Sequence, residues 1–256
     1  MIYGLYLSAA GVMTNSYRQD VISNNIANSE TIGFKRDLAL FQERRTERAD
    51  RGLAPGRSNA MLEALGGGVL ASPTAIDKSQ GELEPSEGNL DMAIVGQGYF
   101  TVSNGDGGEV ALTRNGRFIL NARGHVALAS NEKHELLDIT GKPITVDPKV
   151  KPLIAADGQI SQDSKGVARI AIVDVPDPSQ LKKSGSTMLT YPDTKALRPA
   201  ANASLQSQYI ERANVDPSTE LGSLMDAQRQ LEANANMIRY QDQMLQKLCN
   251  EVGKIS

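Results

Sequence analysis

The side chains best suited to nucleophilic or metal chemistry are few in this chain. It has one cysteine, Cys249, and two histidines, His125 and His134. A single cysteine forms neither an internal disulfide nor a cysteine metal cluster. Neither histidine has a cysteine or carboxylate partner at a metal-ligand spacing, so both are expected on the surface or in strands. Cys249 falls on the apolar stripe of a predicted helix, where a thiol behaves as a small apolar side chain. The sequence therefore predicts no catalytic residue and no metal site.

Two glycine-rich segments resemble ligand-binding loops but lack residues that such loops need. Gly96-Gln97-Gly98 follows an apolar segment, yet Thr101 stands where a dinucleotide-binding loop has its third glycine, and the pattern continues as a strand. Residues 104–108 lack the spaced acids and closing glutamate of a calcium loop. No serine stands in a nucleophile-elbow pattern. The sequence therefore favours turns at both places, no cofactor, and a protein that is not an enzyme.

Three asparagines, Asn24, Asn25 and Asn28, cluster at the end of a predicted helix. Asparagine is a poor helix former, but its side chain satisfies open backbone groups well. One interpretation is a helix-ending turn. The other is an interaction site, because the cluster leads into the distinctive string Thr-Ile-Gly-Phe-Lys-Arg at 31–36. Both interpretations stay open from the residues alone, and Phe34 joins the asparagines as a candidate.

The longest regular pattern lies at the C-terminal end, over residues 216–256. Apolar residues recur there at alternating spacings of three and four, the heptad pattern of a helix packed on other helices. Asp216 suits the cap of this helix and Pro217 its first position. Gln228 and Asp242 interrupt the seam, where buried polar residues can set register and partner number. The seam residues expected at an interface are Leu224, Gln228, Leu231, Ile238, Asp242 and Leu245.

Residues 2–28 form a second amphipathic pattern with helical spacing. Gly4 and Gly11 each weaken an isolated helix by about 1 kcal/mol, but they permit close approach of another helix. Both ends of the chain are therefore expected to be helices that pair with each other and offer an apolar surface to neighbouring molecules. The candidates on the first helix are Leu5, Val12 and Met13.

Between the two helices the apolar period changes from 3.6 to two, which indicates antiparallel strands. Asn115-Gly116 and Asp157-Gly158 are hairpin signals. The apolar run 167–175 predicts the best-buried strand. Residues 43–60 are rich in arginine, and we expect a mobile loop or a short extended arm there.

Composition favours a globular chain with enough residues for a sizeable core, since 40% of residues are hydrophobic and 22% are charged. A net charge of −3 argues against a nucleic-acid partner. No apolar run approaches the length of about 18 residues that a membrane span needs. The N-terminus lacks the basic region of a cleavable signal peptide.

These patterns predict an α+β fold. Long N- and C-terminal helices pack as a coiled coil, and a mostly antiparallel β-domain is inserted between them. The expected division is an N-terminal helix in 1–33, an extended linking region in 34–80, a β-rich outer domain in 81–205, and a connector with the C-terminal helix in 206–256.

The chain resembles the flagellar axial family, the rod and hook proteins of bacteria. That family opens with an amphipathic helix running into a Ser-Asn-Asn-x-Ala-Asn box, here at 23–28, followed by Thr-x-Gly-Phe-Lys, here at 31–35. Two residues depart from the family's pattern. Tyr99 stands where the family usually has phenylalanine, and Leu231 stands where tyrosine is common in the family. Segment 167–189 is more similar to proximal-rod than to distal-rod members. Further similar segments are 89–100, 113–118, 156–158, 214–215, 228–234 and 242–245.

The resemblance implies a structural subunit of the flagellar basal-body rod. Such a subunit polymerises through its terminal helices into a hollow helical drive shaft that transmits torque and lets exported subunits pass. Its implied partners are copies of itself, other rod and hook-family subunits and the flagellar export apparatus, and its implied location is the periplasm, reached without a cleaved signal. The alternative is a soluble monomeric β-rich binding module or enzyme whose long terminal helix packs on its own domain.

Overall fold

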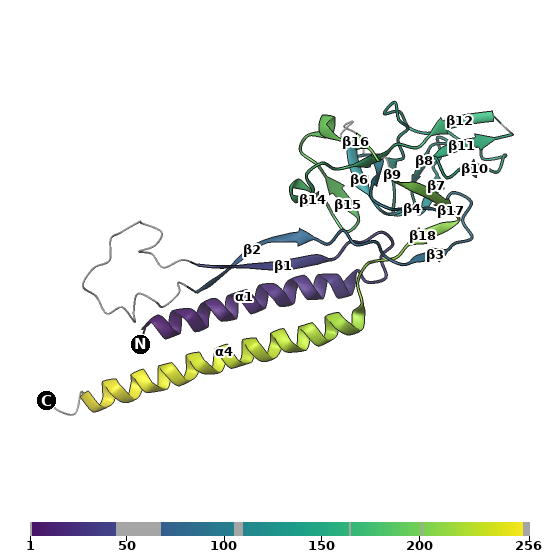
Figure 1. Ribbon diagram of the computed structural model, residues 1–256. Helices are drawn as coiled ribbons and strands as arrows, with labels where there is room; N and C mark the ends of the chain where they lie inside the picture. The colour runs from purple at the N-terminus through teal and green to yellow at the C-terminus, as the bar shows by residue number, and fades with distance from the viewer. Residues whose placement is uncertain (1, 45–67, 105–109, 164, 201, 253–256) are drawn as a thin grey trace. The chain divides into compact units, whose positions relative to one another are not determined.

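The computed structural model describes residues 2–44, 68–104, 110–163, 165–200 and 202–252. Within these residues the fold is α+β, with a long helix near each end and short antiparallel strands between them (Figure 1). Contacts divide the chain into two compact units. The helical unit comprises 1–26, 37–75 and 216–256, and the β unit comprises 27–36 and 76–215.

The helices α1 (Ile2–Ala27) and α4 (Pro217–Val252) confirm the two predicted helices. The cap of α4 is also as predicted, because Oδ1 of Asp216 accepts a hydrogen bond from the Ser218 amide at 3.1 Å and Oδ2 accepts one from the Thr219 hydroxyl. With 36 residues, α4 is about 54 Å long.

Within the helical unit, α1 and α4 run in opposite directions and meet at two glycines (Figure 1). A Cβ atom added to Gly4 would lie 2.7 Å from the Gln241 amide nitrogen, and one added to Gly11 would lie 2.7 Å from that of Asn234. The glycines are seven residues apart on α1, and so are their partners on α4. The absence of side chains at Gly4 and Gly11 therefore lets the two helices approach closely, as the sequence predicted.

A two-stranded ribbon of β1 (Asp37–Glu43) and β2 (Val69–Ile76) lies along α1. The Arg44 amide donates to the Gly68 carbonyl at 2.8 Å at one end of the ribbon. The Tyr17 hydroxyl of α1 donates to the Ser72 carbonyl of β2 at 3.3 Å. The ribbon falls inside the predicted linking region 34–80. Most of the arginine-rich segment expected as a mobile loop lies in 45–67, outside the described residues.

The β unit is built from short strands in several small sheets, the largest being six-stranded in the order β14-β15-β6-β5-β13-β16. Short 3-10 turns stand at η2 (Pro178–Gln180) and η3 (Thr194–Ala196). The strands are β3 (Leu83–Pro85), β4 (Met92–Val95), β5 (Tyr99–Ser103), β6 (Val110–Thr113), β7 (Phe118–Leu120), β8 (Val126–Leu128), β9 (Asn131–Glu135), β10 (Leu153–Ile154), β11 (Gln159–Gln162), β12 (Lys165–Arg169), β13 (Ile172–Asp174), β14 (Lys182–Lys183), β15 (Met188–Thr190), β16 (Arg198–Pro199), β17 (Ser204–Ser207) and β18 (Tyr209–Glu211).

The core of the β unit gathers apolar side chains from β4, β5, β8 and their neighbours. The rings of Phe100 and Phe118 meet edge to face there, with centroids 5.4 Å apart. The strands that precede α4 return to the start of the unit, because β17 pairs with β4 and β18 pairs with β3. The chain therefore enters and leaves the β unit along paired strands.

One predicted hairpin is confirmed and one is wrong. Asp157-Gly158 joins β10 and β11, which pair antiparallel, and Gly158 has a φ of +87°. Asn115-Gly116 joins β6 to β7, but β6 pairs with β5 and β15 while β7 pairs with β8. A Cβ atom on Gly116 would lie 1.6 Å from the Met92 carbonyl oxygen. Here Asn-Gly carries the chain closely past β4 from one sheet to another.

The prediction that 167–175 is the best-buried strand is wrong. The segment divides into the end of β12 and into β13, and β12 is mostly exposed while β13 is only half-buried. Ile170, between the two strands, is buried, whereas Val167 is 43% exposed. The best-buried strands are instead β4, β5 and β8. A mostly apolar stretch does not show how fully its strands are covered, and here Arg169 and Asp174 stand within it.

Candidate interaction surfaces

The string after α1 anchors in the β unit through three consecutive side chains. Phe34 is only 1% exposed and packs with Ala213 and Val215, and the Lys183 ammonium lies 4.1 Å from the centre of its ring. The next residue, Lys35, is also buried. Phe34, which the sequence offered as an interface candidate, is therefore part of a small core within its own chain.

Lys35 belongs to a buried charge cluster centred on Glu211. The Lys35 ammonium lies 2.5 Å from Oε1 of Glu211, and an Arg114 guanidinium nitrogen lies 3.2 Å from Oε2. The Gly81 amide also donates to Oε1, at 2.9 Å. Burial lowers the pKa of the Lys35 ammonium, although pairing with Glu211 acts in the opposite direction. Glu211 is fully buried and bonded on both oxygens, so its carboxylate holds three separated chain segments together.

Arg36 and Asp77 form a second ion pair beside this cluster, with Nε and Oδ2 2.8 Å apart. Partial burial raises the pKa of the Asp77 carboxyl, but hydrogen bonds from Ser79 and the Arg36 charge outweigh it, and the pKa is lowered overall. The Asn214 amide nitrogen donates to the carbonyls of Asp77 and Ser79, each at 3.1 Å. These contacts tie the segment before β1 to the segment after β2 and to the approach to α4.

The three asparagines have different surroundings. Asn25 is only 2% exposed, and its side chain exchanges two hydrogen bonds of 2.9 Å with the backbone of Asp37, at the start of β1. Asn28 accepts a hydrogen bond of 3.4 Å from the Thr31 hydroxyl, and Asn24 is exposed. For Asn25 and Asn28 the helix-ending interpretation is therefore confirmed, while the interface role of all three stays a prediction.

The candidate residues of α4 divide between two environments. Gln228 and Asp242 are exposed, and each bonds along its own helix, to Glu232 and Gln246 respectively, at 3.2 Å. A neighbouring side of α4 lies one residue before three positions of the predicted seam, Gln228, Ala235 and Asp242. This side carries Ala227, Asn234 and Gln241. The Gln241 side-chain oxygen is buried and has no hydrogen-bond partner within the described residues. The half-buried candidates are Leu224, Leu231, Ile238 and Leu245.

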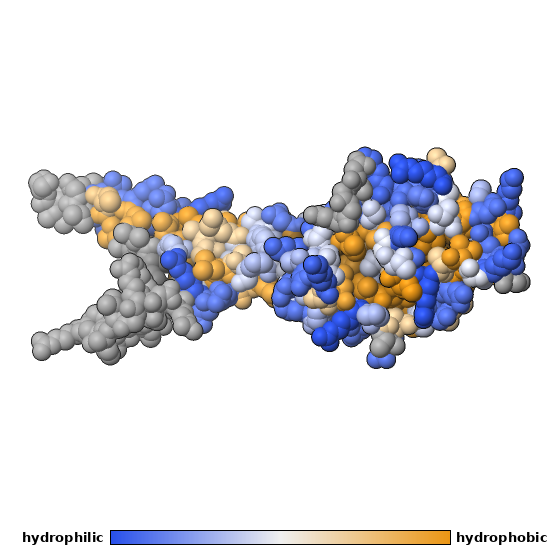
Figure 2. Space-filling view, turned by 90° about the horizontal axis from the view of Figure 1, so that it is seen from above, coloured by the Kyte–Doolittle hydropathy of each residue, from blue (hydrophilic) through white to orange (hydrophobic). Residues whose placement is uncertain are grey.

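On α1, Leu5 and Val12 are half-buried, whereas Met13 is 74% exposed. Met13 is one of many large apolar side chains that the helical unit leaves open to solvent. Two groups stand out, and Figure 2 shows hydrophobic residues gathered along this unit. The α4 stripe consists of Met237, Tyr240, Met244 and Leu248. The ribbon patch consists of Leu38, Leu40, Phe41, Val69 and Leu70.

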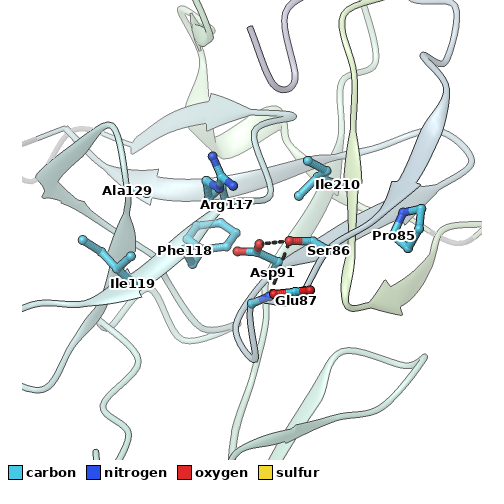
Figure 3. Close-up of a pocket in the computed structure, with 10 residues that line it drawn as sticks. Pro85, Ser86, Glu87, Asp91, Arg117, Phe118, Ile119, Ala129 and Ile210 are labelled. Carbon is cyan, nitrogen blue, oxygen red and sulfur yellow. Dashed lines mark hydrogen bonds between the residues drawn. The ribbon is translucent and has the colours of Figure 1, made fainter. Parts of the chain in front are cut away.

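The β unit also has an open hollow of about 670 Å³, shown in Figure 3. Ser86 and Asp91 point toward each other there, and the Ser86 hydroxyl donates to the Asp91 carboxylate. A Cβ atom on Gly88 would lie 2.5 Å from that carboxylate, so Asp91 stabilises a tight turn. Arg117 and Phe118 are among the other residues that line it. The Ser86 and Asp91 side chains of this hollow are engaged in shaping a loop.

His125 has a carboxylate neighbour that its sequence position did not reveal. Its Nδ1 lies 3.0 Å from Oε1 of Glu135, although this nitrogen does not have hydrogen-bond geometry. The His134 Nδ1 lies 3.0 Å from the Ser103 carbonyl. Within the described ranges, no three histidine, cysteine, aspartate or glutamate side chains gather as metal ligands would. Cys249 is exposed. No helix in the described part of the chain is both long and apolar enough to cross a membrane.

Sequence reasoning missed Glu211 and Arg114 as a pair. They are 97 positions apart, and Glu211 is 176 positions from Lys35. The spacing of nearby residues cannot predict a contact between residues so far apart in the sequence. The one local hint was the position of Glu211 within the short strand β18, because a charged residue is rarely fully buried unless it has partners of opposite charge.

Comparison with known proteins identifies related chains along the whole length. Residues 5–35 match the family described as flagella basal body rod protein, residues 93–162 match the D1 domain of flagellar hook protein FlgE/F/G, and residues 206–251 match the C-terminal region of flagellar basal body rod FlgEFG protein. These three segments include residues 31–35 of the string after α1 and most of α4.

Full-length relatives agree with these matches. The flagellar basal-body rod protein FlgF of Caulobacter vibrioides is 32% identical over 254 residues, which cover 98% of each chain. The rod protein FlgG of Bacillus subtilis is 30% identical over 265 residues, covering 98% of this chain and 99% of the relative. FlgF of Mesorhizobium japonicum is 27% identical over 238 residues, covering 92% and 91%. Since identities of this size extend over nearly the whole length, the chain belongs to the flagellar basal-body rod protein family, whose members are structural proteins and not enzymes.

Proposed function

We propose that this chain is a structural subunit of the bacterial flagellar basal-body rod. It polymerises through its terminal helices, packed as a coiled coil, into a hollow helical drive shaft that transmits torque and lets exported subunits pass. The observation that carries the proposal is the exposure of large apolar side chains along the helical unit of a rod-family chain, since soluble monomers rarely leave such surfaces open.

The physical form of this assembly is a head-to-tail contact that does not close. When one surface of a subunit binds a different surface of the next, repeated contacts generate a helical polymer. The N- and C-terminal helices belong to the core of that polymer, and the β-rich segment 81–205 faces outward. Neighbours in the polymer are copies of this chain and other rod and hook-family subunits. We place the chain in the proximal part of the rod, in line with the resemblance of segment 167–189.

The route to this site completes the proposal. The subunit leaves the cell through the flagellar export apparatus without a cleaved signal and assembles in the periplasm.

A truncation tests the proposed function. Removing 216–256 deletes α4 while leaving the β unit, whose strands and core lie in 76–215. Cells that carry only the truncated chain are expected to build no rod and to lose swimming, while the shortened protein stays soluble. Normal swimming by these cells would refute the proposal.

A further inference from the structure

The two exposed apolar groups of the helical unit lie on different elements and have different shapes. Side chains of the ribbon patch are between 38% and 49% exposed, and those of the α4 stripe between 42% and 61%. The patch is a surface on a two-stranded sheet, and the stripe is a line along a helix.

The α4 stripe lies beside the face of α4 that meets α1. Met237, Tyr240 and Met244 follow one another at spacings of three and four, which places them on one side of the helix, and Leu248 continues the line. The residues that meet the α1 glycines, Asn234 and Gln241, stand on the adjacent side. The pairing of α1 with α4 therefore leaves the stripe uncovered.

The ribbon patch has a similar relation to α1. One side of the ribbon meets α1 through the Tyr17–Ser72 hydrogen bond and through Gly68, where an added Cβ would lie 3.4 Å from Leu7. Leu38 and Leu40 are two residues apart on β1, so they share one face of the strand, and both are exposed. By the same alternation Phe41 faces the opposite side of β1, and Val69 and Leu70 face opposite sides of β2. α1 covers one side of the ribbon and leaves the face that carries Leu38 and Leu40 open.

A single copy does not bring the patch and the stripe together, because α1 lies between the ribbon and α4 (Figure 1). Two unlike apolar surfaces on one chain are what a head-to-tail contact needs, whereas a closed two-fold pair uses one surface twice. The flexible methionine side chains of the stripe suit an apolar sheet surface. One pair of opposite charges also stands near the two surfaces, exposed Glu43 at the end of β1 and exposed Lys247 next to the stripe.

We propose that the ribbon patch of one copy receives the α4 stripe of a second copy of this chain. This inference rests on the proposed function and adds to it the two surfaces that meet. It gives the ribbon a direct part in assembly, beyond the pairing of terminal helices.

Cross-linking between two full-length chains tests the contact. Both chains carry Cys249→Ser, one also carries Leu40→Cys, and the other carries Met244→Cys with a small affinity tag. They are produced together in cells that lack the native chain, and isolated basal bodies are treated with a mild oxidant. The proposal predicts a mixed disulfide dimer on a non-reducing gel.

The matched control replaces Met244→Cys by Gln246→Cys, which is exposed but on another side of α4. We expect about tenfold less mixed dimer in this control, because cross-linking follows local concentration. The pair Leu38→Cys and Tyr240→Cys repeats the test with different substitutions. Chains present in basal bodies without mixed dimer above the control, in both pairs, would overturn this contact and leave the proposed function standing. Absence of the Cys249→Ser chain from basal bodies would count against the proposed function itself.

Discussion

Glu211 is the residue on which the buried charges of the β unit depend. It lies between Lys35 and Arg114, and all three side chains are at most 5% exposed. Arg114 also donates to the Gly96 carbonyl at 2.7 Å, while its Nε has no hydrogen-bond partner within the described residues. Removing the carboxylate would leave two buried cations facing each other. The stability of the β unit is therefore expected to depend on this one carboxylate.

We predict that Glu211→Gln lowers the free energy of unfolding by about 3–5 kcal/mol, the usual cost of breaking a buried ion pair. Urea denaturation of the full chain measures it. The control is Glu84→Gln, since Glu84 pairs with Arg212 at 3.0 Å on the surface, where both side chains are nearly half exposed. That change should cost less than about 1 kcal/mol. Equal effects of the two substitutions would show that the buried cluster has no special weight.

Asp77 gives the β unit a defined dependence on acid. Its pKa is lower in the folded chain than in the unfolded one, so the unfolded state binds the proton more readily. The stabilisation by Asp77 is therefore present above the ordinary aspartate pKa and is lost as the pH falls through the folded pKa. We predict that Asp77→Asn flattens the acid side of a plot of unfolding free energy against pH. An unchanged slope in this variant would contradict the assignment.

Among individual side chains, some contacts could be predicted from the sequence and others could not. The string 31–36 was recognised as unusual, but the partners of Lys35 and Arg36 come from positions far along the chain. Asn25 was identified correctly because the end of a helix needs local hydrogen bonds, and those follow from nearby residues. Local hydrogen bonding could be predicted, whereas the long-range ion pairs could not.

At the scale of elements, α1 and α4 follow from periodicity and capping alone. The side of α4 that meets α1 coincides only in part with the predicted seam, whose role at a subunit interface stays a prediction. Half of the seam, from Leu224 to Leu245 in steps of seven, is half-buried. Its other half includes Gln228 and Asp242, which are exposed, and the adjacent side meets the glycines of α1. The short strands were harder to predict, since pairing partners such as β17 and β4 are distant in sequence.

The glycine contacts yield a prediction for the helix pair. Leucine is a far better helix former than glycine, yet Gly11→Leu places its side chain against Asn234 and should cost about 1–3 kcal/mol by overpacking. The control is Gly222→Leu in α4, where an added Cβ meets nothing within 4 Å. Thermal unfolding followed by the circular dichroism of helices should show a lower midpoint for Gly11→Leu and an unchanged or higher one for Gly222→Leu. A raised midpoint for both would mean that α1 and α4 do not pack at Gly11.

For the whole molecule, a substitution can leave the folding stability of a single chain unchanged and still prevent many chains from assembling. Met244 is 55% exposed, so Met244→Asp should change the free energy of unfolding by no more than about 0.5 kcal/mol. In a polymer the same carboxylate would be buried without a partner, which is costly. We therefore predict a normally folded chain that no longer supports swimming. Gln246→Asp serves as the control: it loses one exposed hydrogen bond to Asp242 and should cost no more than about 0.5 kcal/mol while swimming stays intact. Swimming by the Met244→Asp strain would speak against burial of the stripe.

The central claim is that this chain is a subunit of the rod. Electron cryomicroscopy of intact basal bodies, with this chain located along the axis, tests it most directly. We expect repeated copies in the rod, with α1 and α4 around the central channel. Rods that are complete without this chain, or copies found only outside the rod, would contradict it.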